Sequence, residues 1–209
     1  MKKTIISCVL FLTAVTAFSQ TPMKTAAEAK LSASDLAVKI ADRILATTTY
    51  EFKNTKTGKT YKSVKNLPLD MNVKVACKYN NWHYTNGVTH IALMELADKT
   101  GAKKYDDYVL KNMNFVFNEG NLDFFKKQYE QAMKNEGWYG VRKLSWHMIF
   151  RGKRLDDNGP MGASLIELQM RYPNQSFLDY VNETAEHLNY GEPRLVDGTI
   201  ARIWPHVNT

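Results

Sequence analysis

Apolar residues recur with a helical period over most of the chain after residue 33. Leu36, Ile40 and Ile44 lie on one face of the first such stretch, and we expect an amphipathic helix over 34–46 with Ser34 as its N-cap. The same pattern predicts helices over 85–97, 104–117, 122–134, 160–171 and 176–189, with a break at Gly137–Gly140 after the fourth of the six.

Strand signals are weak by comparison. Residues 51–72 have no helical period and are expected to form a long loop. Strand-like residues are confined to Arg194–Ile203, where Asp197-Gly198 predicts a small hairpin. The predicted fold class is therefore all-α.

The helical pattern repeats at an offset of 72 residues. Matched pairs are Asn86-Gly87 with Asn158-Gly159, Glu95-Leu96 with Glu167-Leu168, Asp107-Tyr-Val109 with Asp179-Tyr-Val181, and Tyr105 with Phe177. A repeat of helix pairs indicates an α-solenoid or a closed ring of helical hairpins.

The N-terminus has the pattern of an export signal. Lys2 and Lys3 precede a short apolar run, and small residues at Ala17-Phe-Ser19 suit cleavage, so residues 1–19 are predicted to be a signal peptide. Residues 20–33 read as a flexible lead-in. The mature protein is expected to be exported, either periplasmic or secreted, with no membrane span.

Charge and cysteine content limit the classes of partner that the protein is expected to bind. Removal of Lys2 and Lys3 with the signal lowers the formal net charge from +7 to +5. The basic residues are scattered, whereas nucleic-acid binding favours a concentrated patch; an acidic substrate or a plain solvated surface fits as well. A single cysteine, Cys77, remains, and no zinc-like spacing occurs.

Two aspartates, Asp156 and Asp157, stand at the mouth of the helix expected over 160–171, before an expected turn at Asn158-Gly159-Pro160. Unpaired N–H groups at a helix start stabilise a carboxylate. One reading is a helix cap and the other is a catalytic carboxyl group.

Polar and aromatic residues precede the two matched helices expected over 85–97 and 160–171. In a repeat of helical hairpins, the loops before such helices converge at one end of the structure. Aromatic rings, imidazoles, amides and acids are the side chains that bind sugars. An alternative interpretation is that Trp82 and Trp146 are core anchors and that His83 and His147 are structural histidines. The candidate substrate-binding residues from these loops are Trp82, His83, Tyr84, Asn86, Trp146, His147 and Arg154.

Three motifs, Trp82–Val88, Arg154–Gly162 and Arg202–Thr209, resemble the unsaturated glucuronyl and rhamnogalacturonyl hydrolases, glycoside hydrolase families 88 and 105. The resemblance covers about residues 34–209. It implies an (α/α)6 barrel that removes the terminal 4,5-unsaturated uronic acid from lyase-generated pectin or related oligosaccharides. It also implies that Asp156, or alternatively Asp157, is one of two active-site aspartates, and that His206 lies in a substrate-binding motif. No metal or organic cofactor is expected for this reaction.

Family members are longer, and the second aspartate is expected in a Trp-x-Asp-Asp segment after Thr209. Residues 34–209 are therefore expected to form about half of the barrel and to have negligible activity alone. The alternatives are a non-catalytic helical-repeat binding protein of the cell envelope, or another α/α-barrel sugar enzyme such as an epimerase.

Overall fold

The computed structural model describes residues 32–117, 120–150 and 155–201, and only the backbone of 155–157. The chain forms two compact units, Met1–Ile40 and Ala41–Thr209. Within the first unit, only residues 32–40 are described. The expected signal peptide 1–19 and nearly all of the lead-in 20–33 lie outside the described residues.

Helix α2 (Ala33–Thr47) begins at a reciprocal cap. The pattern predicts Ser34 as the N-cap, and this prediction is wrong by two residues. The hydroxyl of Ser32 accepts from the Asp35 backbone N–H over 3.1 Å, and the Asp35 carboxylate accepts in return from the Ser32 N–H over 3.2 Å. Because this pairing satisfies two helix-start donors at once, it fixes the start at Ser32.

The described chain is mostly helical, as predicted. The bounds of α4 agree with the prediction, and α3 ends at Gly101, whose φ of 68° closes the helix with a left-handed residue. The break inside α5 is also confirmed, because Gly137 has φ 58° and ψ −149°. The helices of the second unit are α3 (Tyr84–Thr100), α4 (Lys104–Phe117), α5 (Asn121–Val141), α6 (Leu155–Arg171) and α7 (Gln175–Glu186).

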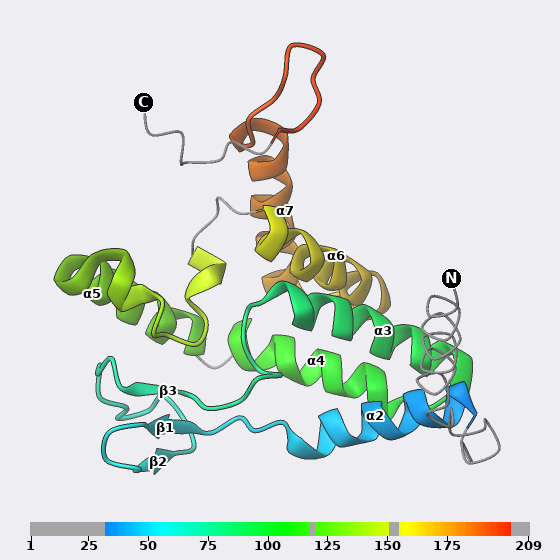
Figure 1. Cartoon of the computed structure of the whole chain (residues 1–209), viewed down its shortest axis with the longest axis horizontal. Helices are drawn as coiled ribbons and strands as arrows, with labels where there is room; N and C mark the ends of the chain where they lie inside the picture. The colour runs from blue at the N-terminus through cyan, green and yellow to red at the C-terminus, as the bar shows by residue number, and fades with distance from the viewer. Residues whose placement is uncertain (1–31, 118–119, 151–154, 202–209) are drawn as a thin grey trace, which may run out of the picture. The chain divides into compact units, whose positions relative to one another are not determined.

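The repeat corresponds to two helical hairpins, α3–α4 and α6–α7, that pack against each other mainly through α3 and α6 (Figure 1). Tyr105 near the start of α4 and Phe177 near the start of α7 are both fully buried. Asp107 and Asp179, which form another matched pair of the repeat, are both exposed. Residues at the 72-residue offset thus occupy equivalent positions.

Two strands of a small antiparallel sheet lie within residues 51–72, the segment predicted to be a loop, and the third follows it directly, so that prediction is wrong at the strands. The strands of the sheet are β1 (Phe52–Asn54), β2 (Thr60–Tyr61) and β3 (Val73–Val75), in the order β2-β1-β3. Strands of two or three residues are too short to show an alternating pattern in sequence. Phe52 fixes the sheet to the helices, since its ring centre lies 5.6–5.9 Å from those of Phe115, Phe124 and Phe125.

The expected turn at Asn158-Gly159-Pro160 is also wrong, because α6 begins at Leu155 and runs through all three residues. Pro160 lacks the N–H that would bond the carbonyl of Asp156, so this helix start leaves one extra carbonyl without its intrahelical donor. Tertiary contact with α3, described below, outweighs the local turn preference.

The last described residues form the predicted hairpin. Arg194 and Ile200 make an antiparallel bridge, and Gly198 has a φ of 85°. The Arg194 guanidinium donates to the carbonyl of Leu188 over 2.9 Å, which ties the hairpin to the π-helical turn η3 (His187–Gly191).

The far end of α6 is held by Arg171, which lies among three carboxylates. It donates to Asp98 over 2.7 Å and to Glu167 over 2.8 Å, and it lies 3.3 Å from the buried Asp106. Hydrogen bonding to Arg171 lowers the pKa of Asp98. Hydrogen bonding to Asp98 and Glu167 raises the pKa of Arg171. This cluster joins α3, α4 and α6.

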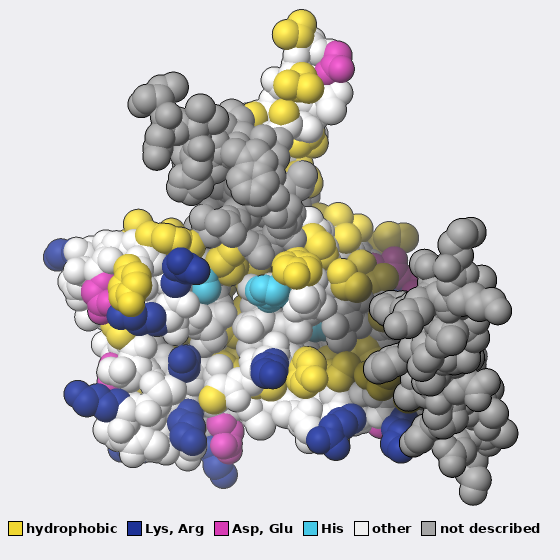
Figure 2. All heavy atoms as spheres, viewed as in Figure 1, with side chains coloured by type: hydrophobic (Ala, Val, Ile, Leu, Met, Phe, Trp, Pro, Cys, Tyr) yellow, Lys and Arg dark blue, Asp and Glu magenta, His cyan; other side chains and the backbone are white. Residues whose placement is uncertain are grey.

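Lysine and arginine side chains lie in separate spots over the face drawn in Figure 2. None of the described helices combines the length and apolarity needed to cross a bilayer.

Candidate functional site

The start of α3 is shaped by His83, which caps the helix. Its extended backbone (φ −153°, ψ 143°) places Nδ1 3.4 Å from the Thr85 N–H, which donates to it, and 2.8 Å from the Thr85 hydroxyl. The His83 ring lies 4.6 Å from that of Tyr84, whose side chain is 47% exposed. His83 therefore has a structural role, and Tyr84 presents an open aromatic ring beside it.

Asn86 holds the loop that leads into α3. Its buried amide donates to the carbonyl of Lys78 over 3.0 Å and to that of Asn81 over 3.1 Å. The same amide lies 2.6 Å from the Asn81 side-chain oxygen. These bonds use the donors of Asn86 within the protein and fix the backbone next to Trp82.

Trp82 joins the starts of α3 and α6. The indole is 1% exposed, and its Nε1 donates to Asn158 Oδ1 over 3.0 Å. Asn158 follows Asp156 and Asp157 directly, in the N-terminal part of α6. The structure thus brings the loop before α3 beside the helix start that carries the two aspartates.

The backbones of α3 and α6 touch at Gly87. A Cβ on Gly87 would overlap the carbonyl carbon of Pro160 and lie 2.5 Å from the amide nitrogen of Met161. Only glycine permits this approach. The contact explains why position 87 is a glycine.

Trp146 belongs to the same aromatic cluster and is 1% exposed. Its ring centre lies 6.4 Å from that of Trp82 and 5.9 Å from that of Phe125, and its Nε1 has no hydrogen-bond partner among the described residues. Both indoles are core anchors in this structure, with no open face on which a sugar could stack.

His147 begins the 3₁₀ helix η2 (His147–Phe150) and is half-buried. Its Nδ1 lies 2.9 Å from the carbonyl of Leu144, and its ring lies 5.9 Å from that of Trp138. His147 is thus positioned by its own loop.

The two predicted catalytic positions, 156 and 157, are in the first turn of α6, and their side chains are outside the described residues. Arg154 and His206 also lie outside the described residues. The roles proposed for these four residues stay predictions.

A small cavity of about 100 Å³ adjoins this helix start, and the sequence reasoning did not find it. Asn158 and Gly159 line it on one side, and α7 and η3 close the other side with Tyr180, Glu183, His187 and Glu192. His187 Nε2 lies 3.0 Å from Glu192 Oε1. Burial raises the pKa of Tyr180, whose ring packs 5.1 Å from that of Trp82.

Glu183 lies one helical turn before His187, a spacing that could have drawn attention to this group from sequence alone. His187 pairs with Glu192, and Glu183 lines the same cavity. The described residues include no group of three or more His, Cys, Asp or Glu side chains suited to hold a metal ion.

Comparison with known proteins gives no assignment: no protein-family model matches the chain, and no curated protein does.

Proposed function

We propose that this chain is part of a glycoside hydrolase that removes the terminal 4,5-unsaturated uronic acid from oligosaccharides released by polysaccharide lyases. The observation that carries the proposal is the hydrogen bond between Trp82 and Asn158. It joins the motif Trp82–Val88 to the motif Arg154–Gly162, which are distant in sequence. Motifs that share one site are expected to meet in this way.

The proposal includes an (α/α)6 barrel. Its support is the pair of hairpins α3–α4 and α6–α7, which repeat at a fixed offset and pack through α3 and α6. In such a ring, the starts of α3 and α6, together with the loops that precede them, lie at the same end of the barrel. The exposed ring of Tyr84 is then available to a sugar at that end.

The proposed chemistry is hydration of the double bond. A carboxylic acid donates a proton to the enol ether, water adds at carbon five, and the resulting hemiketal collapses to release the sugar. Asp156 is our first choice for one carboxyl group of the required pair, with Asp157 as the alternative. A carboxylate at a helix start is stabilised in its charged form, and its charge raises the pKa of an acid beside it.

The test follows the loss of ultraviolet absorbance when the conjugated double bond of a lyase-generated disaccharide is hydrated. The protein assayed is the complete product of the gene. Asp156→Asn is expected to lower kcat by about 100-fold or more. Asp179→Asn, at an exposed position of α7, is the matched control and should retain activity.

Unchanged absorbance with the folded parent protein would refute the proposal. Loss of activity in Asp157→Asn but not in Asp156→Asn would move the assignment to the second aspartate.

Export is part of the same proposal, since lyase products are met outside the cytoplasm. It rests on the pattern of residues 1–19. Sequencing the N-terminus of the protein from periplasmic or culture fractions should show cleavage near Gln20.

A further inference from the structure

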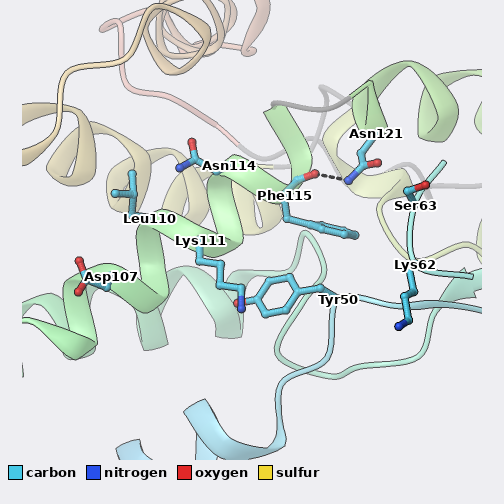
Figure 3. A pocket seen from close by; sticks show the side chains of 9 residues that line it. All are labelled: Tyr50, Lys62, Ser63, Asp107, Leu110, Lys111, Asn114, Phe115 and Asn121. Carbon is cyan, nitrogen blue, oxygen red and sulfur yellow. Dashed lines mark hydrogen bonds between the residues drawn. The ribbon is translucent and has the colours of Figure 1, made fainter. Parts of the chain in front are cut away.

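A hollow of about 340 Å³ lies against α4, and its lining includes none of the residues at the helix starts described above (Figure 3). One wall is the α4 surface with Lys111 and Asn114. The opposite wall is formed by Tyr50 and by Lys62 and Ser63, from the turn after β2. Its size matches the lower range of small-molecule sites.

The hollow has positive charge that the described residues do not neutralise. Neither Lys62 nor Lys111 forms an ion pair with a described carboxylate. The one acidic residue of the lining, Asp107, is already paired with Lys103 over 3.1 Å. An anion that enters the hollow would therefore meet positive charge that no described carboxylate already pairs.

One of these ammonium groups is held in place. Lys111 Nζ lies 4.4 Å from the centre of the Tyr50 ring, within the range of a cation–π contact. In Figure 3 the Tyr50 ring lies between Lys111 and Lys62. The ring thus keeps Lys111 at the hollow and adds an apolar wall beside the charge.

Polar groups complete the lining. Ser63 supplies a hydroxyl, and Asn114 and Asn121 supply side-chain amides. Asn121 is buried and is oriented by a hydrogen bond to the carbonyl of Phe115 over 2.5 Å. Hydroxyls and amides bind sugar hydroxyls, and an ammonium group binds an acidic substituent.

We propose that this hollow binds a sugar acid, a small polyhydroxy ligand that carries a carboxylate. The choice of a uronate over other anionic sugars rests on the proposed function, whereas the anion site itself does not. The site is separate from the start of α6, so it would retain acidic saccharide chains without taking part in the hydration reaction.

The test is a titration of isotope-labelled protein with galacturonate, galactose and galactose 6-phosphate. Binding is measured through the chemical shifts of the backbone amides. Galacturonate is saturated and is not a substrate for the proposed reaction. It should bind at least about tenfold more tightly than galactose and should shift amides at 62–63 and 110–115. Lys62→Met with Lys111→Met should weaken this binding about tenfold or more.

Lys59→Met is the matched control, because Lys59 also lies over a tyrosine ring, 5.1 Å from the centre of Tyr61, but does not line the hollow. It should change affinity less than about twofold. If the double variant unfolds, Lys62→Glu reverses the exposed charge without altering α4 and should give a comparable loss.

Equal binding of galactose and galacturonate, or shifts located elsewhere, would overturn the site. Tighter binding of galactose 6-phosphate would overturn the uronate in favour of a sugar phosphate. Loss of hydrolase activity in the Asp156 variant with galacturonate binding retained would separate this site from the proposed function.

Discussion

Trp82 donates its indole N–H to the side-chain oxygen of Asn158 over 3.0 Å, with both side chains buried. This bond links the loop before α3 to the first turns of α6. A buried donor that loses its partner costs more than the bond itself contributes, since the donor remains away from water.

Asn158→Ala is therefore expected to lower the free energy of unfolding by about 1–3 kcal/mol. Urea denaturation measures it, and Asn182→Ala, at an exposed position of α7, is the control. In a Trp82→Phe background the same change should cost less, because the donor is absent. Equal costs in the two backgrounds would show that the bond is not the cause.

Gly87→Ala is expected to destabilise the protein by about 1–3 kcal/mol, because the added methyl overlaps the backbone of Pro160. Gly159→Ala is a close control on the facing helix, where a Cβ meets no atom within 4 Å. That change should be neutral or stabilising by up to about 1 kcal/mol, since alanine favours the helix. Thermal unfolding of the two variants side by side decides the point.

Stability should depend on pH through His90. Burial lowers its pKa from 6.5 to about 4, so the unfolded chain binds the proton more readily. The stabilisation is complete above pH 6.5 and is lost as pH falls toward 4, with a total change of roughly 3 kcal/mol. In His90→Gln this part of the slope should disappear; a variant with the parent's slope between pH 4 and 6.5 would contradict the assignment.

Arg171→Met should cost about 3 kcal/mol, because it leaves the buried carboxylate of Asp106 without its cation. Lys103→Met removes an exposed ion pair with Asp107 and should cost much less, because water screens this pair. Similar losses in the two variants, measured by urea denaturation at one salt concentration, would argue against a special role for the Arg171 cluster.

Local signals explain what the sequence could predict. The bounds of α4 and the end of α3 at Gly101 depend on residues next to them, namely an amphipathic period and a left-handed glycine. The equivalence of Tyr105 and Phe177 could also be predicted, since a repeat places both at the same point of a hairpin.

The sequence pattern does not predict features that depend on contacts between residues far apart in the chain. Phe52 forms a strand because three phenylalanines surround it, and its own neighbours do not show this. Asn158-Gly159-Pro160 has the composition of a turn, yet the contact with Gly87 keeps it helical. The spacing of Glu183 and His187 is visible in the sequence, whereas their closeness to Asn158 is not.

The closeness of Gly87 to Pro160 also limits how α6 can rotate about its own axis. A turn by one residue, about 100°, would bring the side chain of Met161 to the crossing, where no space exists for it. Only one rotational setting is therefore compatible with the crossing. A residue without a side chain, in a different hairpin, thus helps to position the first turns of α6, which include positions 156 and 157.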